Sequence, residues 1–474
     1  MTTPGRLVSN SVVAAVGSVT QRLLHFGTAL LLARGLGGEQ FGVYAFVSAY
    51  MSLFGFIVDL GFERVIAREL ARAPERSGEL LGTGFIMRAI LSTIAAAAAV
   101  GVAWAVRLPE LTRWCIFLAA LGMPLSVDIF VRSFFQVRFQ VHYNYLLTMP
   151  GSIMFVALAA LVLSLGGNLL IIFGVALITG VFSVSLMLWV GLPKMHVVWR
   201  LNPQLVRYLW RESWELGAAF LVWLITWRID QVLLYWLRGP SELAQYAVAV
   251  KITEALSLIS ESVMVTIFPL LASTQVSAPE RFRRIYQLTV RYLVVIVLPI
   301  ALVLTWERDW VLRLLFGAGY AAAGAALVIL AWWAFFAYMG AVYVSLMIVR
   351  SQQRLIAQVS TVSLVINVAL NFICVPVWGA AGAAAAMLVT SASSFALFCV
   401  APQSRNMMRV CCDEAVRPLV AVGTTALLLA LFAPPALRAF ATVPLYAVIL
   451  SLIGGVDRDD WQLARQLWRA TPDA

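Results

Sequence analysis

The chain has 474 residues, of which 62% are hydrophobic and 12% charged, and its formal net charge is +11. Soluble proteins carry about 45–50% apolar and about 25% charged residues, so this composition excludes an ordinary soluble protein and indicates a membrane protein. The polar links between the apolar runs are short, and none is long enough to form a separate soluble domain. We therefore expect the whole chain to be a membrane body.

Apolar runs long enough to cross a bilayer as a helix, about 20 residues each, follow one another along the chain. The first run contains Arg22 and lacks a small-residue cleavage site, so we expect a retained helix and not a signal peptide. Clusters of Pro, Gly and Arg bound fourteen candidate spans, at residues 8–33, 41–60, 80–105, 112–134, 144–165, 169–192, 213–237, 244–271, 288–307, 324–349, 356–377, 381–401, 416–433 and 437–455. This pattern predicts an all-α polytopic membrane protein with about fourteen transmembrane helices.

The Lys and Arg residues are distributed unequally between the two sides that these spans define. With the N-terminus in the cytoplasm, 23 of the 34 fall in cytoplasmic loops and flanks and seven on the opposite side. Because basic loops tend to stay in the cytoplasm, this asymmetry predicts that both termini are cytoplasmic. Arginines that face anionic lipid headgroups also account for the net positive charge without a nucleic-acid partner.

Two short motifs recur at nearly the same spacing. The motif "APER" occurs at residues 73–76 and 278–281, and "GGEQFGVYA" at 37–45 aligns with "GPSELAQYA" at 239–247. Both pairs occupy equivalent positions in two sets of six spans. This agreement indicates a duplication, and six spans return the chain to the same side, so the two repeats are predicted to be parallel.

The repeat predicts how the chain is divided. We expect an N-lobe at residues 1–193, a cytoplasmic amphipathic linker at 194–212, a C-lobe at 213–402, and two further helices with a cytoplasmic tail at 403–474. Membrane proteins built from such repeats are typically transporters that work by alternating access, with the site between the lobes near the midplane.

Four segments run in order along the chain: "LLARGLGGEQFGVYAFVSAYMSLFGFIVDLGFERVIAREL", "WRIDQVLLYWLRGPSELAQYAVAVKI", "LLFGAGYAAAGAALVIL" and "NVALNFICVPVWGAAGAAAA". They resemble the polysaccharide-biosynthesis (Wzx-type) flippases of the multidrug/oligosaccharidyl-lipid/polysaccharide exporter superfamily, over essentially the whole chain. The resemblance implies two six-helix lobes around a central cavity, commonly with two extra C-terminal helices.

The resemblance also implies an activity. Such flippases move oligosaccharides linked to undecaprenyl diphosphate from the cytoplasmic to the outer leaflet of the bacterial inner membrane. The products are cell-surface polysaccharides such as O-antigen, capsule or exopolysaccharide. Membrane lipids, a polysaccharide polymerase and other export machinery are the partners that this activity implies.

Charged side chains inside the predicted spans are candidates for function, because each costs about 2.5–3.5 kcal/mol on insertion scales. In the first span, Arg22 shares a helix face with Ser18 and His25. A polar stripe on this helix must face protein or water, and we expect it to line a cavity. The alternative is that such charges join helices as structural ion pairs.

The seventh and eighth spans carry two further pairs. In "LVWLITWRIDQVLLYWL", Arg228 and Asp230 are about 200° apart around the helix, so one is expected to face a cavity and the other a neighbouring helix. The resemblance marks the Asp of this "RxD" element as a signature position, which implies a role for Asp230 in holding the fold. Lys251 and Glu254 are i,i+3 neighbours on one helix face.

A diphosphate headgroup needs cations in a cavity of low dielectric constant, and the arginine guanidinium matches phosphate oxygens well. The acidic residues among them would keep the empty cavity near neutral. We therefore predict substrate binding by Arg22, His25, Arg228 and Lys251, and ion coupling by Glu254 and Asp230. Other polar residues within the spans are interpreted as structural contacts: Asp59 with Arg88, Asp128 with Arg132, and Asn367 and Asn371 between helices. The alternatives are that Asp59 and Arg88 extend to the interface and that the two asparagines contact sugar hydroxyls.

The sequence contains no GxxxxGK[ST], GxSxG or HExxH motif, and its five cysteines have no metal-ligand spacing. We expect no metal, no cofactor and no enzymatic activity. The driving force is then an H⁺ or Na⁺ gradient, the membrane potential or removal of the product outside. Proton antiport would use the carboxylates or His25.

Two other functions fit parts of the pattern. An ion-coupled multidrug or metabolite exporter of the same fold predicts an acidic or aromatic cavity, against which the cationic excess argues. A membrane glycan polymerase or transferase generally needs a large external loop. The external links here are short, such as "GGN" after the fifth span, and leave little room for chemistry.

Overall fold

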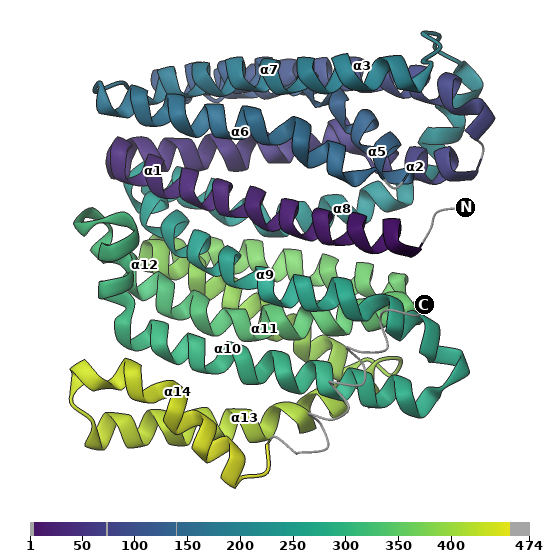
Figure 1. The fold of residues 1–474 in the computed structure, drawn as a ribbon. Helices are drawn as coiled ribbons and strands as arrows, with labels where there is room; N and C mark the ends of the chain where they lie inside the picture. Colours follow the sequence, from purple (N-terminus) through teal and green to yellow (C-terminus); the bar gives the residue numbers. More distant parts are fainter. Residues whose placement is uncertain (1–3, 73, 139, 456–474) are drawn as a thin grey trace. The chain divides into compact units, whose positions relative to one another are not determined.

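The computed structural model describes residues 4–72, 74–138 and 140–455, and within these ranges it contains helices and no strand (Figure 1). The predicted all-α fold is confirmed. The chain forms two compact units, residues 1–244 and 245–474, each of which is described by itself.

Within the described residues, the first unit contains eight α-helices, two 3-10 helices and the first residues of a ninth α-helix. The helices wholly within it are α1 (Pro4–Asp59), α2 (Phe62–Arg72), η1 (Pro74–Arg76), α3 (Ser77–Ala105), α4 (Glu110–Leu121), η2 (Met123–Asp128), α5 (Ile129–Val137), α6 (Val141–Ser164), α7 (Leu169–Met195) and α8 (Pro203–Arg238). The remaining helices are α9 (Pro240–Ser277), α10 (Pro279–Phe316), η3 (Ala318–Ala323), α11 (Gly324–Val349), α12 (Gln353–Val400), α13 (Arg405–Phe432) and α14 (Pro435–Leu452).

The fourteen predicted spans all fall on helices, but two pairs of spans are joined. Spans 8–33 and 41–60 form the single helix α1, and spans 356–377 and 381–401 form α12. The described spanning part of α1 has 44 residues and α12 has 48. At 1.5 Å per residue these are about 66 and 72 Å, roughly two crossings of a 30 Å hydrocarbon core.

Both long helices turn at a glycine. Gly37 has φ 74° in α1 and Gly379 has φ 54° in α12. A residue with a Cβ rarely adopts such a φ, whereas glycine does so at little cost. Each glycine therefore reverses the helix direction without a connecting loop.

The predicted span 112–134 is not one continuous helix. It consists of α4, the 3-10 helix η2 and α5, and Pro124 stands in the first turn of η2. Proline has no backbone N–H and clashes with the preceding helical turn, so the α-helical hydrogen bonding stops there. The break places Ser126 and Asp128 on an irregular segment.

In the first unit, a core forms where α2, α3, α5 and the beginning of α8 meet. Its members include Ile66, Leu81, Phe135 and Leu209, all at most 1% exposed. The short helix α2 turns Val65, Ile66 and Leu70 inward and leaves Arg72 exposed. This helix is thus amphipathic and is held to the unit by its apolar face.

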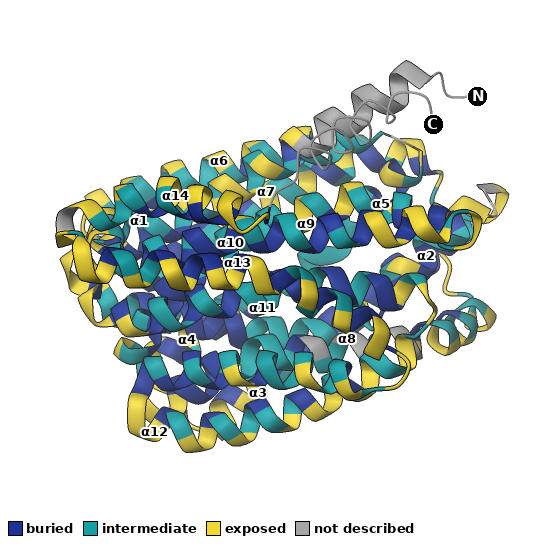
Figure 2. Ribbon diagram, turned by 90° about the horizontal axis from the view of Figure 1, so that it is seen from below, coloured by how far each residue is buried: buried dark blue, intermediate teal, exposed yellow. Residues whose placement is uncertain are grey.

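The second unit is organised around α10, which packs against α11, α13 and α14. Buried residues run along most of α10, as the dark segments in Figure 2 show. Tyr338 on α11 donates a hydrogen bond to the Leu256 carbonyl of α9, at 2.6 Å. Because α13 and α14 both pack against α10, the two C-terminal helices are part of the second unit.

The predicted linker, residues 194–212, leads directly into a long helix. Asn202 caps the N-terminus of α8, where its side-chain oxygen accepts hydrogen bonds from the backbone N–H groups of Gln204 and Leu205. From Pro203 the helix continues to Arg238 through the predicted seventh span. All of α8 belongs to the first unit. The sequence repeat predicts a boundary between the lobes at residues 193–213, and this boundary stays a prediction.

Candidate functional site

Arg22 and His25 lie on the first arm of α1, before its turn at Gly37, and both side chains are exposed, whereas Ser18 is half-buried. This arm packs against α6. A methyl group added at Gly17 would lie 2.4 Å from the Tyr145 ring, so glycine permits the close approach.

The second arm of α1 packs against α8, the helix that carries Arg228 and Asp230. The rings of Phe46 and Tyr235 stack with their centroids 3.8 Å apart. Next to Tyr235, a Cβ at Gly42 would lie 1.8 Å from the Pro240 carbonyl oxygen. Near the other end, a Cβ at Gly217 would lie 2.7 Å from the Leu60 oxygen. These contacts show that α8 runs antiparallel to the second arm of α1, from one end of this arm to the other.

The depth of the two arginines follows from helix geometry. At a rise of 1.5 Å per residue, Arg22 lies about 22 Å along α1 from Gly37, and Arg228 about 16 Å along α8 from Gly239. Gly37 and Gly239 are at the same end of the unit, because Gly42 approaches Pro240. Both arginines therefore lie within the depth of a hydrocarbon core of about 30 Å.

Arg228 and Asp230 differ in burial. The Asp230 side chain is 2% exposed, and its Oδ1 accepts a hydrogen bond of 2.8 Å from the backbone N–H of Gln231. Arg228 is only half-buried. The two side chains thus face different surroundings, as their angular separation on the helix predicts.

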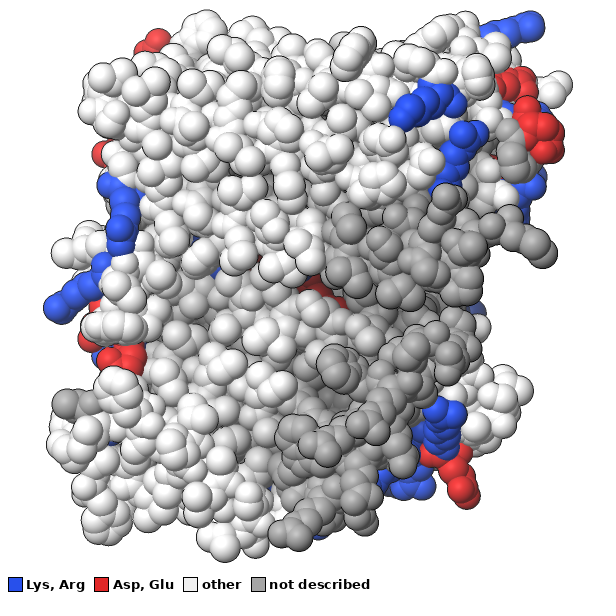
Figure 3. Space-filling model, in the orientation of Figure 1, with Lys and Arg blue, Asp and Glu red and all other residues white. Residues whose placement is uncertain are grey.

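Lys251 and Glu254 form an ion pair on α9, with 2.7 Å between Nζ and Oε2, so the predicted i,i+3 contact is confirmed. Their side chains are 35% and 30% exposed. The pair is therefore only partly enclosed by the protein. On the face in Figure 3, the charged side chains of each unit lie mostly toward the helix ends.

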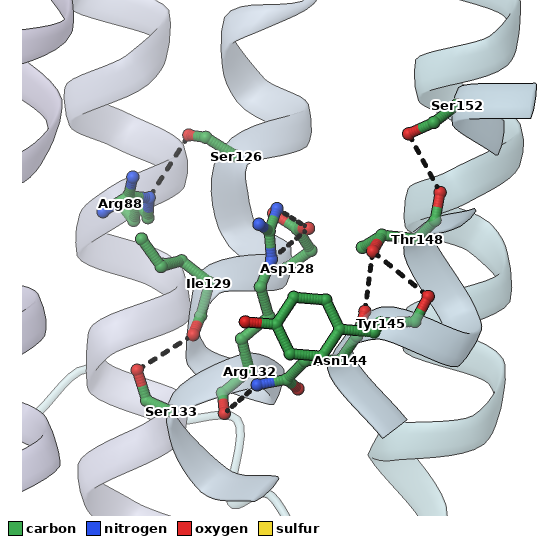
Figure 4. Close-up of polar contacts among 10 residues, drawn as sticks. All are labelled: Arg88, Ser126, Asp128, Ile129, Arg132, Ser133, Asn144, Tyr145, Thr148 and Ser152. Carbon is green, nitrogen blue, oxygen red and sulfur yellow. Dashed lines mark hydrogen bonds and ion pairs between the residues drawn. The ribbon is translucent and has the colours of Figure 1, made fainter. Parts of the chain in front are cut away.

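The structural pairing predicted for Asp59 with Arg88 is confirmed. Arg88 Nη1 lies 3.6 Å from Asp59 Oδ1, and Arg88 Nε donates a hydrogen bond of 3.2 Å to Ser126 Oγ (Figure 4). Arg88 is 7% exposed. The Ser126 contact connects α3 to the 3-10 helix η2, and this partner could not be predicted from the sequence.

The second predicted pair, Asp128 with Arg132, is also present. Arg132 Nε donates to Asp128 Oδ2 at 2.9 Å across one helical turn, and Asn144 Nδ2 donates to the Arg132 carbonyl at 3.2 Å (Figure 4). Asp128 is 5% exposed. These contacts connect α5 to α6 and serve the packing of the first unit.

Asn367 connects the two arms of α12, and Asn371 lies one turn away on the same arm. Both are at most 1% exposed. Asn371 Nδ2 donates to Asn367 Oδ1 at 3.2 Å, and Asn367 Nδ2 donates to Thr390 Oγ1 at 3.4 Å, beyond the turn at Gly379. The predicted bridging role is confirmed for Asn367, whereas Asn371 donates to Asn367 on its own arm.

Charged groups outside the spans tie α2 to the beginning of α8. Arg68 Nη2 lies 3.0 Å from Glu212 Oε2, and Arg68 Nε lies 3.0 Å from Glu69 Oε1. Hydrogen bonds from Arg68 to Glu212, Glu69 and Tyr208 raise the pKa of its guanidinium. Burial and the neighbouring Asp59 raise the pKa of Glu63, against the lowering effect of Arg88.

Among the residues whose placement the structure describes, no group of three or more His, Cys, Asp or Glu side chains is arranged to hold a metal ion. The polar side chains that the described part of the structure brings into contact form ion pairs and asparagine hydrogen bonds.

Comparison with known proteins gives a family match. Residues 7–275 match the family model described as "Polysaccharide biosynthesis protein". A search of curated proteins finds no match to this sequence.

Solved structures of membrane transporters share the fold. A structure of the lipid II flippase MurJ, in an inward closed conformation, is similar with a TM-score of 0.70 and 12% sequence identity, over 94% of this chain and 98% of that one. An inward-facing multidrug resistance MATE family transporter is similar with a TM-score of 0.65 and 14% identity, over 83% and 96%.

A third structure is a MOP superfamily transporter from Pyrococcus furiosus, described as having a binding pocket of reverse polarity that suggests a different function. Its TM-score is 0.59 at 14% identity, over 86% of this chain and 96% of that one. At these identities the likeness concerns the fold, and the fold is that of multi-pass membrane transporters.

Proposed function

Because the chain belongs to the polysaccharide biosynthesis protein family, we propose that it is a flippase for oligosaccharides linked to undecaprenyl diphosphate. It moves them by alternating access from the cytoplasmic to the outer leaflet of the bacterial inner membrane, with both of its own termini in the cytoplasm. The family match carries this proposal, and the fold shared with a lipid II flippase supports it. The chain acts as a transporter and not as an enzyme.

The diphosphate is bound by cations from the helices α1, α8 and α9. Arg22 and His25 are exposed on α1, and Arg228 is half-buried on α8, at depths within the hydrocarbon core. Lys251 is about one-third exposed. Because all are accessible to some degree, each has room to contact phosphate oxygens, and arginine binds these in a bidentate geometry.

The ion coupling uses Glu254 and Asp230. Glu254 Oε2 lies 2.7 Å from Lys251 Nζ. When phosphate oxygens bind Lys251, the Glu254 carboxylate gives up this contact and becomes available to a coupling ion. Binding of the substrate and binding of the ion are thereby linked. Asp230 is the second acidic group, and its burial makes its charge sensitive to helix movement.

Headgroup binding tests the proposal. Arg22→Ala and Arg228→Ala should each weaken the binding of undecaprenyl diphosphate without sugar about tenfold or more, since a charge-assisted hydrogen bond contributes roughly 1.5–3 kcal/mol. Arg313→Ala removes an exposed arginine elsewhere and should leave the affinity unchanged. If well-folded Arg22→Ala and Arg228→Ala proteins bind the lipid as tightly as the parent, the proposed site is wrong.

A structural role for Arg228 predicts a different result. In that case Arg228→Ala lowers the yield of folded protein, and the double variant Arg228→Ala with Asp230→Ala restores it.

Glu254→Gln tests the proposed ion coupling. Transport in proteoliposomes should lose its dependence on the pH gradient while protein abundance stays normal. Unchanged dependence would locate the coupling group elsewhere.

A second candidate function is ion-coupled export of drugs or metabolites, which the similarity to the fold of a multidrug transporter favours. It predicts that organic cations bind and that undecaprenyl diphosphate does not compete with them. Competition by the lipid for the same site would decide for the flippase.

A further inference from the structure

A groove of about 720 Å³ lies along the beginning of α8, within the first unit. Its walls are mainly apolar, and they include Leu201, Val206, Trp210, Trp214, Arg207 and Arg211. We call this the α8 groove. Its volume is within the range of about 300–1,000 Å³ that small-molecule sites occupy.

The opposite face of the same helix is fixed to the protein. Leu209 is fully buried in the core of the first unit, and Glu212 is paired with Arg68 of α2 at 3.0 Å. Tyr208 donates a hydrogen bond to Glu69 at 3.1 Å. These contacts set the rotation of α8, so the groove face is presented outward and is formed before any ligand arrives.

The outward face carries two parallel rows of side chains. Val206, Trp210 and Trp214 follow at i,i+4 spacing and form an apolar row, in which Trp210 is 49% and Trp214 60% exposed. Arg207 and Arg211, also four residues apart, form a cationic row beside it. Neither arginine has an ion pair or hydrogen bond with any residue whose side chain the structure describes.

The two rows determine the chemistry of a partner. An exposed tryptophan pair is typical of the level where membrane and water meet, and α8 continues from here into its apolar, membrane-depth segment. Arginines at this level attract anionic lipid headgroups. A molecule that satisfies both rows needs an anionic group and a hydrocarbon chain.

We propose that the α8 groove binds an anionic phospholipid, with its phosphate between Arg207 and Arg211 and its acyl chain along Trp210 and Trp214. The site uses none of the cations assigned to the substrate. Because the groove face is part of the helix that carries Arg228, a lipid bound there fixes the position of this helix end in the cytoplasmic leaflet.

The experiment uses the full-length protein in detergent, titrated with dioctanoyl phosphatidylglycerol and, in parallel, with dioctanoyl phosphatidylcholine, with bound lipid counted by native mass spectrometry. An arginine near an anionic surface contributes about fivefold in affinity. The double variant Arg207→Gln with Arg211→Gln should therefore bind phosphatidylglycerol at least tenfold more weakly. Trp214→Ala should weaken it as well.

The control variant removes two charges outside the groove. Arg64 and Arg72 are exposed on α2, so Arg64→Gln with Arg72→Gln changes the net charge equally and should leave the binding of phosphatidylglycerol unchanged. Arg207→Lys with Arg211→Lys should retain most of the affinity. Phosphatidylcholine should bind weakly to all variants.

Three results would overturn the proposal. Equal losses in the groove variant and the α2 variant would mean nonspecific electrostatic attraction. Glycerol phosphate that binds as tightly as phosphatidylglycerol would mean an anion site without a lipid. A glutamate-rich peptide that requires Arg207 and Arg211, while phosphatidylglycerol does not, would mean an acidic protein partner.

Discussion

The ion pair between Arg291 on α10 and Glu414 on α13 is expected to hold the C-terminal helices to the second unit. Arg291 Nε donates to Glu414 Oε2 at 2.7 Å, and the two side chains are 13% and 12% exposed. Glu414→Leu removes the carboxylate and leaves the Arg291 guanidinium in a site nearly closed to water.

The expected magnitude follows from that burial. Removing one partner of a buried pair takes a counter-charge from a desolvated group and costs about 3–5 kcal/mol, whereas replacing both partners by apolar residues is often neutral or stabilising. We therefore expect Glu414→Leu to lower the free energy of unfolding by about 3–5 kcal/mol. The double variant Arg291→Met with Glu414→Leu should recover most of this loss.

The assay is reversible unfolding of the full chain in mixed micelles with increasing denaturing detergent, analysed as a double-mutant cycle. The matched control is the pair Arg308–Asp309, at 3.8 Å with side chains 46% and 59% exposed. An exposed pair contributes about 0–1 kcal/mol, so its cycle should give little coupling. A coupling energy for Arg291–Glu414 no larger than that of the control would refute this reasoning.

Three further predictions concern the first unit. Gly42→Ala places a Cβ 1.8 Å from a backbone oxygen and should lower stability by about 1–3 kcal/mol or more, measured by thermal unfolding, while Gly55→Ala, with nothing within 4 Å, should not destabilise. Burial raises the pKa of Glu63 in the folded state, so the free energy of unfolding should fall as pH rises through that pKa. Glu63→Gln should remove this contribution to the pH dependence of the free energy of unfolding. An unchanged pH dependence in the variant would contradict the prediction. In a cysteine-free background, Glu75→Cys should react with an impermeant thiol reagent only after cells are permeabilised and Leu165→Cys should react in intact cells; the reverse pattern would invert the topology.

Hydrophobic run length was sufficient to predict the fold, because a helix that crosses a bilayer must be both long and apolar. It was not sufficient to predict how neighbouring spans are connected. The residues around Gly37 and Gly379 suggest ordinary loops, yet each glycine takes a positive φ and the helix resumes at once. Such a turn depends on a single backbone conformation, which composition does not reveal.

Contacts along one helix were predictable, whereas contacts between helices were not. The spacing of Lys251 and Glu254, or of Asp128 and Arg132, fixes their proximity once the segment is helical. The partners of Arg291 and Arg68 come from helices far along the chain. Only packing brings them together, so a sequence without an alignment offers no signal for them.

Burial separates the charges of this protein into two groups with different physical properties. Arg88 and Arg291 are almost completely buried and lie against carboxylates on other helices, so exchanging their partners would require desolvated charges to separate, at several kcal/mol. Arg22, His25 and Lys251 are exposed or partly exposed, and for them a change of partner costs much less. A transporter must release its substrate as readily as it binds it, and a ligand moves a conformational equilibrium only by its difference in affinity between the two states. In the proposed function the accessible cations meet that requirement, whereas the buried pairs hold the helices that carry them.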